Sequence, residues 1–170
     1  MQRIIKNGEV IDERWHLLPV DATLDGISNS DDLIVPLGLW LESSHALKVR
    51  DGGLGVWLQS HEQIEDIVDD LKHFQVIALD FPAFTDGRHF SSARLLRERY
   101  GYKGEIRAIG DVLRDQLFFM HRCGFDAFAV RPDRDPYDAL KGLSDFSVTY
   151  QTGVDQPLPL EATLSVLPCR

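Results

Sequence analysis

Cysteine is scarce in this chain. Cys123 and Cys169 are the only two, and they lie far apart in the sequence. They form no CxxC motif and provide no disulfide framework. Two thiols also cannot ligate a four-cysteine iron–sulfur cluster within one chain. We therefore predict no metal site.

Long apolar segments and cofactor motifs are missing too. No apolar run is long enough to cross a bilayer, and residues 1–6 are too short and too interrupted for a signal peptide. The sequence contains no GxGxxG, P-loop, HExxH or GxSxG motif. We therefore expect a cytoplasmic protein without a membrane partner, and the sequence identifies no cofactor.

Basic residues are rare in the first half of the chain. Residues 9–87 contain sixteen acidic and four basic side chains, whereas residues 88–134 contain ten basic and six acidic ones. The overall net charge of −9 argues against nonspecific binding of nucleic acid. The local basic excess fits a small anionic ligand or an acidic protein partner, and it also fits ordinary solvated helix faces.

The chain length of 170 residues fits one domain with a sizeable core. Asn7-Gly8 supplies the positive φ angles of a type I′ turn between residues 3–6 and 9–14, which predicts an N-terminal β-hairpin. We expect a single α/β domain over residues 1–150, with the hairpin within residues 1–20 and βα repeats over residues 33–150. Residues 151–170 turn to proline and loose apolar residues, which indicates an extended C-terminal tail.

Strand and helix patterns alternate from residue 33 onward. The predicted strands span residues 33–35, 55–59, 76–81, 105–109, 126–131 and 146–150. The predicted helices follow Pro36, begin at a Ser60–Gln63 capping box, span residues 91–100, run from the N-cap Asp111 to Arg122, and open at Asp135-Pro136. This alternation predicts right-handed βαβ units and a mainly parallel sheet.

The two faces of the predicted strands differ in polarity, because successive side chains point to opposite sides. One face is wholly apolar and suits helix cover: Ile77, Leu79, Phe81, Ile106, Ala108, Phe128 and Val130. The other also carries charges: Val76, Ala78, Asp80, Glu105, Arg107, Ile109, Ala127, Ala129 and Arg131. A doubly wound sheet would cover both faces with helices, whereas a barrel lumen has a polar mouth. The pattern favours a partial or shortened TIM-like barrel, since eight βα units need about 250 residues. An open doubly wound sheet is the alternative.

Charged residues stand at or just after the ends of three predicted strands, namely Asp80, Asp111 and Arg131. Ligands bind at the carboxyl ends of parallel strands, so we predict a site there. An Asp80–Arg107 pair would orient a substrate or tune a proton donor, with Asp80 as a catalytic acid or base. The structural alternative is a buried ion pair that satisfies itself.

The loop after the Asp80 strand carries further candidates. Gly87 lets the backbone turn, and the planar fork of Arg88 suits an anion. His89 is a second candidate for catalytic acid or base. Turn chemistry alone also explains Asp86-Gly87.

The remaining charged candidates divide between ligand and partner. The predicted substrate-binding residues are Asp86, Arg88, Arg107, Asp111 and Arg131. For Asp111, helix capping is the alternative. The predicted partner-binding residues are Arg97, Arg114 and Asp115, of which the last two lie off the apolar stripe of their helix.

Several motifs occur together between residues 79 and 126. They are Leu79-Asp80-Phe81-Pro82, Asp86-Gly87-Arg88, Ser92-Ala93-Arg94-Leu95-Leu96-Arg97, Tyr100-Gly101-Tyr102-Lys103-Gly104, Arg107-Ala108, Gly110-Asp111-Val112-Leu113-Arg114-Asp115-Gln116 and Cys123-Gly124-Phe125-Asp126. With the segments from Pro36 to Trp40, Gly55-Val56-Trp57-Leu58 and Asp155-Gln156-Pro157-Leu158-Pro159-Leu160, this combination resembles a bacterial family of unknown function that is often described as an oxidoreductase of sulfite reduction. Members of that family tend to be encoded beside the sulfite reductase haemoprotein, which implies a role in sulfate assimilation. The family has no established catalytic residues to carry over.

These observations leave three functions open. The first is an accessory protein of assimilatory sulfite reduction, which binds the sulfite reductase haemoprotein, a cofactor precursor or a sulfur oxyanion held by Arg88, Arg107 and Arg131. The second is a barrel-mouth enzyme that acts on a small anionic substrate by acid–base chemistry. The third is a protein-binding module without chemistry of its own. An incomplete barrel exposes edge strands, so a homodimer that covers them is a further expectation.

Overall fold

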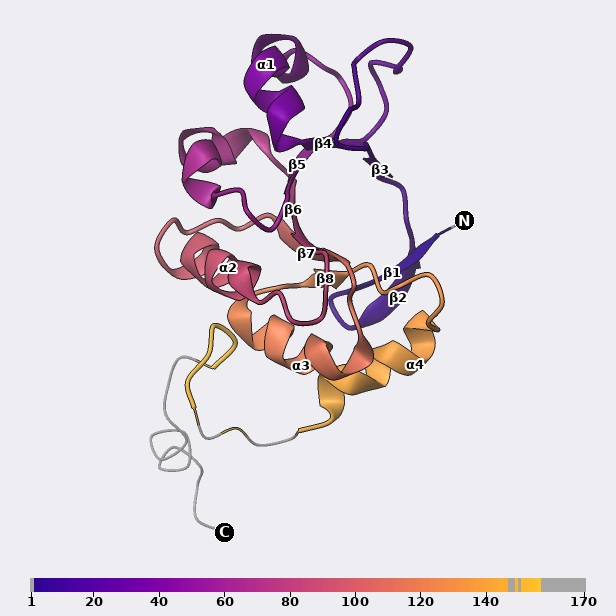
Figure 1. Cartoon of the computed structure of the whole chain (residues 1–170), viewed down its shortest axis with the longest axis vertical. Helices are drawn as coiled ribbons and strands as arrows, with labels where there is room; N and C mark the ends of the chain where they lie inside the picture. The colour runs from indigo at the N-terminus through magenta and orange to yellow at the C-terminus, as the bar shows by residue number, and fades with distance from the viewer. Residues whose placement is uncertain (1, 147–148, 150, 157–170) are drawn as a thin grey trace.

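The computed structural model describes residues 2–146, 149 and 151–156, and Figure 1 shows their arrangement. In this part of the chain one sheet has the strand order β2-β1-β8-β7-β6-β5-β4-β3. The strands are β1 (Arg3–Lys6), β2 (Glu9–Asp12), β3 (His16–Leu17), β4 (Leu33–Pro36), β5 (Leu54–Leu58), β6 (Val76–Phe81), β7 (Glu105–Gly110) and β8 (Ala127–Phe128). Strands β3 to β8 are parallel, and β1 is antiparallel to both of its neighbours.

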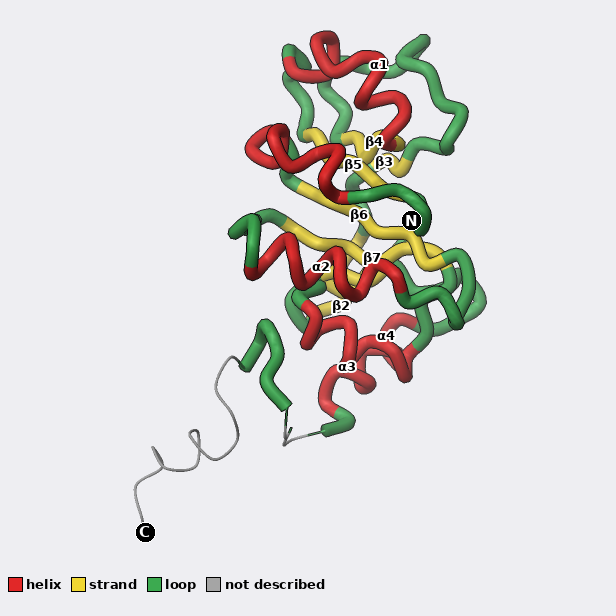
Figure 2. Tube along the Cα trace, turned by 60° about the vertical axis from the view of Figure 1, so that its left-hand side comes forward, coloured by secondary structure: helices red, strands yellow, loops and turns green. Residues whose placement is uncertain are grey.

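The helices lie on the outer side of the curved sheet, as Figures 1 and 2 show. They are α1 (Leu37–Lys48), the 3-10 helix η1 (Ile64–His73), α2 (Arg88–Glu98), α3 (Arg114–Cys123), α4 (Pro136–Leu140) and the 3-10 helix η2 (Lys141–Ser144). The sheet is therefore a curled, mostly parallel half-barrel with an N-terminal antiparallel pair. An open sheet with helices on both faces is not what the chain forms.

The connection from β2 to β3 shows how strongly the sheet curves. These two strands are the edges of the sheet, yet only residues 13–15 separate them. Four Cα steps from Asp12 to His16 span at most about 15 Å. The edges of a flat sheet of this size would lie about 34 Å apart, because neighbouring strands are spaced at about 4.8 Å. The sheet therefore has to curl, and the connection runs along its open side (Figure 1).

The two faces of the sheet separate as the strand alternation predicts. All residues of the predicted apolar face belong to the main core beneath the helices. The inner face carries a smaller cluster made of Trp15, Ile34, Val76, Ala78 and Ile109, with Trp57 and Ala129 packed against it. Trp15 belongs to the β2–β3 connection, so this connection covers part of the inner face.

Two terminal predictions can be compared with the structure. The hairpin is confirmed: β1 and β2 pair around Asn7 and Gly8, whose φ angles are 50° and 81°. Part of the predicted strand at residues 146–150 lies outside the described residues. All of the predicted tail beyond residue 156 lies outside them too. Residues 151–156 fold back onto α3, where the N–H of Val154 donates to the Arg122 carbonyl at 2.9 Å.

Two helix-start predictions are wrong. Ser60 does not open a capping box, because the segment that follows is the 3-10 helix η1, which has no side-chain cap. Asp111 does not cap α3, which begins at Arg114 after the N-cap Leu113. Gly110 has a φ of 91° and turns the chain after β7, so Asp111 lies in a loop where its carboxylate binds other partners.

Two strand lengths also differ from prediction. β8 pairs over Ala127–Phe128 instead of residues 126–131, and the two-residue strand β3 was not predicted. Both are short segments whose pairing depends on a neighbouring strand rather than on their own alternation. None of the helices in the described part of the chain is long and apolar enough to span a membrane.

Candidate functional site at the mouth of the half-barrel

The carboxyl ends of the parallel strands form one rim, which we call the mouth. A cleft of about 510 Å³ opens there, and we call it the mouth cleft. Its lining consists of Leu17, Leu18, Pro19, Val20, Trp57, Gln59, Ser60, His61, Asp80 and Pro82. The lining is mostly apolar and contains one carboxylate, that of Asp80. The cleft thus lies at the end of the strands where the sequence predicts a site.

Asp80 lies on the inner face of β6, opposite Ile109 of β7. Its side chain is half-buried, and burial raises the pKa of its carboxyl, with a further increase from the charge of Asp86. Gly110 leaves room for this carboxylate, since a Cβ added there would lie 2.5 Å from Asp80 Oδ1. Among the residues that the structure describes, no hydrogen bond or ion pair is made by the Asp80 carboxylate.

The neighbouring acids of the rim all have partners. Asp86 accepts two hydrogen bonds from Arg88, at 2.7 Å from Nη2 and 3.0 Å from Nε. These bonds, with a smaller contribution from Ser60, lower the pKa of Asp86 to about 2 although burial opposes them. Asp133 accepts from Arg131 at 2.7 Å, which lowers its pKa. Asp80 thus differs from its neighbours in having no cation beside it.

Asp111 connects the three loops that follow β6, β7 and β8. Its Oδ2 accepts a hydrogen bond from the Phe84 N–H at 3.1 Å, and its Oδ1 accepts from Arg131 Nη1 at 3.0 Å. Arg131 also binds Asp133, and these bonds raise the pKa of its guanidinium. The structure therefore brings Asp111 and Arg131 together, but in contact with each other rather than open to a ligand.

Arg107 lies deeper inside the half-barrel than the rim, and it does not pair with Asp80. Its guanidinium binds Glu13 of the β2–β3 connection, and Glu105 of its own strand at 2.6 Å. Lys6 Nζ lies 2.7 Å from the other oxygen of Glu105. The side chain of Arg107 is 3% exposed, and both of its partners are carboxylates of the protein. Arg107 is therefore part of a buried ion-pair group, with Glu13 and Glu105 in place of the expected Asp80.

His89 lies in the first turn of α2 and lines a different cleft from Asp80. It is 2% exposed, and both ring nitrogens have partners: Gln59 O at 3.0 Å from Nε2, and Ser92 Oγ at 3.2 Å from Nδ1. Burial lowers the pKa of this imidazole, against the opposing effect of the Gln59 carbonyl. The ring is therefore neutral near pH 7, with a fixed orientation.

The residues assigned to partner binding do not form one surface. Arg97 donates to the carbonyls of Tyr102, Gly104 and Gly124 and to the carboxylate of Asp126. These contacts tie α2 to the loops before β7 and β8. The position of Arg97 in the fold therefore has a sufficient structural explanation.

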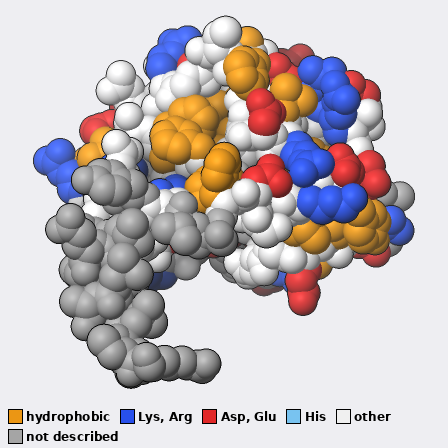
Figure 3. Space-filling view, turned by 90° about the horizontal axis from the view of Figure 1, so that it is seen from below, with side chains coloured by type: hydrophobic (Ala, Val, Ile, Leu, Met, Phe, Trp, Pro, Cys, Tyr) orange, Lys and Arg blue, Asp and Glu red, His pale blue; other side chains and the backbone are white. Residues whose placement is uncertain are grey.

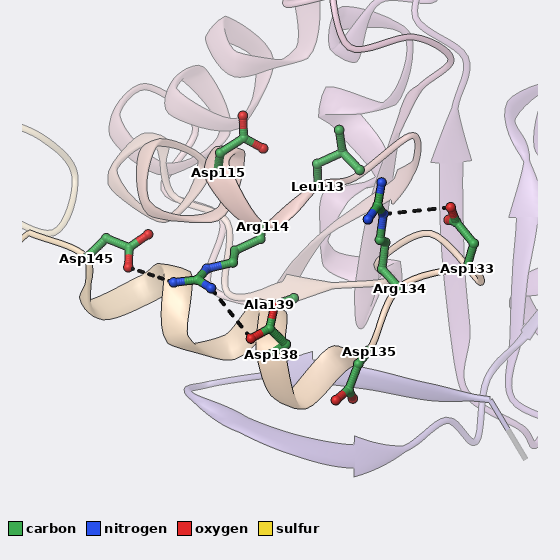
Figure 4. A pocket seen from close by; sticks show the side chains of 9 residues that line it. All are labelled: Leu113, Arg114, Asp115, Asp133, Arg134, Asp135, Asp138, Ala139 and Asp145. Carbon is green, nitrogen blue, oxygen red and sulfur yellow. Dashed lines mark hydrogen bonds and ion pairs between the residues drawn. The ribbon is translucent and has the colours of Figure 1, made fainter.

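Arg114 and Asp115 line a cleft of about 560 Å³ between the start of α3 and α4, shown in Figure 4. Arg114 lies between Asp138 and Asp145, at 3.5 Å and 3.3 Å.

Figure 3 shows acidic, basic and apolar side chains interspersed on the face seen from below. No group of His, Cys, Asp and Glu in the described part of the chain is arranged to hold a metal ion.

Sequence reasoning missed several residues of the mouth cleft. Trp57 donates its indole N–H to the Leu18 carbonyl at 2.9 Å, which holds the residues after β3 over the cleft. Its place on the inner face follows from the alternation of β5, where Trp57 pairs with Ala78 of β6. Residues 17–20 carry no comparable signal, because they reach the mouth through the parallel pairing of the unpredicted strand β3 with β4.

The fold and the cleft define a class: an α/β half-barrel with a ligand-sized cleft at the carboxyl ends of its strands. Residues 55–161 match the family described as Bacterial protein of unknown function (DUF934), and the chain belongs to this family. The matched region begins at β5 and contains Asp80, Asp86, Arg88 and Asp111. No curated protein matches the chain.

Proposed function

We propose that the mouth cleft binds a small ligand and that Asp80 exchanges a proton with it. The observation that supports this proposal is the half-buried, unpartnered carboxylate of Asp80 among rim carboxylates that all have partners. A carboxyl group that lines a cleft without a protein partner can exchange a proton with a bound ligand.

The lining of the cleft indicates the class of ligand. Trp57, Leu17 and Val20 provide apolar surface, and Asp80 provides one acceptor. A ligand with a flat apolar part and a hydrogen-bond donor or positive charge fits this combination. The proposed substrate is therefore a neutral or cationic molecule that Asp80 can protonate or deprotonate.

The three arginines predicted to hold an anion argue against a free sulfur oxyanion as the ligand of Asp80. Arg88 and Arg131 at the rim already hold carboxylates, and the buried Arg107 holds two. An anion at the rim would have to displace one of these carboxylates. The unpartnered carboxylate of Asp80 would also repel it.

A binding experiment on the full chain tests this assignment. Benzylamine and benzoate are compared as probes, with the Trp57 indole N–H resonance as the readout. Benzylamine should shift this resonance and benzoate should not. Asp80→Asn should weaken benzylamine binding about tenfold or more, because it removes the charged acceptor. Asp133→Asn, a rim change outside the mouth cleft, is the matched control. Preference for benzoate, or equal binding by Asp80→Asn, would contradict the proposal.

We propose an accessory role in sulfite reduction as the biological context of this site. The observation that favours it is that two motifs of the family resemblance reach the mouth cleft: Gly55-Val56-Trp57-Leu58 supplies Trp57, and Leu79-Asp80-Phe81-Pro82 supplies Asp80 and Pro82. The motifs Asp86-Gly87-Arg88 and Gly110-Asp111 lie next to them, at the ends of β6 and β7. The cleft would serve the pathway by acting on a ligand or by docking the sulfite reductase haemoprotein.

Growth of a deletion strain on sulfate, sulfite and sulfide as separate sulfur sources tests this role. Failure on sulfate and sulfite with growth on sulfide is the expected result. Complementation with the wild-type chain should restore growth, whereas Asp80→Asn should not. Normal growth of the deletion strain on all three sources would contradict the accessory role without affecting the binding experiment.

A further inference from the structure

A second cleft, of about 310 Å³, lies beside the first turns of α2. We call it the α2 cleft, and its lining consists of Ser60, His61, Glu62, Gln63, Ile64, Glu65, Arg88, His89, Ser91, Ser92 and Leu95. It shares Ser60 and His61 with the mouth cleft but contains neither Asp80 nor Trp57. The α2 cleft is therefore distinct from the Asp80 site.

The hydrogen bonds of His89 determine its tautomer. The Gln59 carbonyl oxygen can only accept, so the ring nitrogen beside it, Nε2, carries the proton. Nδ1 is then the free base, and the hydroxyl of Ser92 donates to it. The ring is buried and neutral, with the carbonyl in the position that orients the base. Ser92, His89 and the Gln59 carbonyl thus form a hydrogen-bonded chain of nucleophile, base and orienting acceptor.

The surroundings of this pair fit a reacting group. Ser92 is half-buried, whereas its neighbour Ser91 is exposed and has no bond to the imidazole. Arg88 lies four residues before Ser92 on the same helix, so both side chains lie on one face and line the same cleft.

We propose that Ser92 is a nucleophile activated by His89 and that the α2 cleft accepts acyl esters. As the Ser92 oxygen bonds to the ester carbonyl carbon, its proton passes to His89 Nδ1. The tetrahedral oxyanion then collapses, the C–O bond to the alcohol breaks, and the alcohol leaves with the proton from Nδ1. Water hydrolyses the Ser92 ester by the same proton transfers in reverse order, releasing the acid.

A fluorophosphonate reagent tests the nucleophile directly on the full chain. The Ser92 oxygen would displace fluoride from phosphorus and increase the mass of the protein by one phosphonyl group. Peptide mass spectrometry should place the adduct on Ser92, and labelling should be about 100-fold faster than that of Ser91. Ser92→Ala should abolish labelling, and Ser144→Ala, which removes an exposed serine outside the α2 cleft, should leave its rate unchanged. Equal labelling of Ser91 and Ser92, or none on Ser92, would overturn the proposal.

The pH dependence of labelling tests His89 without a variant that could fail to fold. The rate should fall at low pH as Nδ1 becomes protonated. The charges acting on this imidazole are those of Asp86 and Arg88, and the other titratable groups lining the cleft are His61, Glu62 and Glu65. His61→Gln should keep the same profile. A rate that does not fall with pH, or a profile that is lost in His61→Gln, would contradict the role of His89.

Discussion

Arg107 and Glu13 lie 94 residues apart in the sequence and form an ion pair inside the half-barrel. Glu13 belongs to the three-residue connection between the edge strands, and Arg107 lies in the middle of β7. This pair attaches the connection to the inner face of the sheet. The half-barrel is thereby held in its curled form by a polar contact in addition to the packing of Trp15.

Arg107→Met should destabilise the protein by about 3–5 kcal/mol, because it leaves the buried carboxylate of Glu13 without its cation and leaves Glu105 with Lys6 alone. Urea unfolding followed by circular dichroism measures this loss. The control is Arg3→Met, whose partner is Asp12 and whose side chain is 52% exposed, and it should change stability little. Adding Glu13→Gln to Arg107→Met should recover part of the loss, and additive effects of the two changes would show that the pair is not coupled.

Asp80→Asn should stabilise the protein at neutral pH. The pKa of Asp80 is raised above its usual value of 3.8 in the folded state, so the ionised carboxylate is disfavoured by folding. The free energy of unfolding should therefore fall as the pH rises from about 3.8 through the folded pKa, and then level off. The variant lacks this fall and should match the wild type at about pH 3.

Asp133→Asn should change the free energy of unfolding at neutral pH in the opposite direction to Asp80→Asn. Hydrogen bonds from Arg131 lower the pKa of Asp133, so its contribution to stability is present above its usual pKa and lost as the pH falls. This variant should be less stable than the wild type at neutral pH. Thermal unfolding between pH 3 and pH 7 measures both effects, and equal responses of the two variants would contradict the distinct position of Asp80.

Gly110→Ala should destabilise the protein by about 2 kcal/mol or more. Gly110 has a φ of 91°, and an added Cβ would meet Asp80 Oδ1 and Phe81 O, both at 2.5 Å. Gly101→Ala is the matched control, because its φ of 64° is also left-handed but its Cβ would meet nothing within 4 Å. The two changes in unfolding free energy should differ by the cost of the clash, and similar values would show that the Asp80 carboxylate and the Phe81 backbone both move aside freely.

Arg97→Lys should cost about 2–4 kcal/mol, because an ammonium cannot serve the acceptors that the guanidinium reaches. Those acceptors are the carbonyls of Tyr102, Gly104 and Gly124 and the carboxylate of Asp126. Urea unfolding is again the measurement. Arg94→Lys, on the exposed side of the same helix, keeps a single ion pair with Glu98 and should behave like the wild type. A similar loss of stability in both variants would indicate that replacing any arginine of α2 destabilises the helix, and that the contacts of Arg97 with the loops before β7 and β8 contribute little.

The sequence by itself favoured a partial barrel, with an open doubly wound sheet as the alternative, and it indicated which strand ends carry charged residues. Alternation within a strand is a local property, so the apolar and charged faces of β6 and β7 could be predicted without knowing their neighbours. The position of Asp80 at a strand end follows from the same pattern. The start of α3 was mispredicted because Asp111 is a good N-cap by type, while in the fold its carboxylate is used by Phe84 and Arg131 from other loops.

Only the tertiary structure decided which charged side chains form ion pairs with each other. Arg107 was expected to pair with Asp80, which lies on the neighbouring strand two residues beyond the position opposite Arg107. It binds Glu13 instead, because the sheet curls and brings the β2–β3 connection over its inner face. Arg88 and Arg131 are likewise occupied by Asp86 and Asp133. Ion pairing depends on distances of a few ångströms between side chains, and residues distant in sequence reach such distances only when the chain folds. For that reason the free carboxylate of the mouth became visible only in the folded molecule.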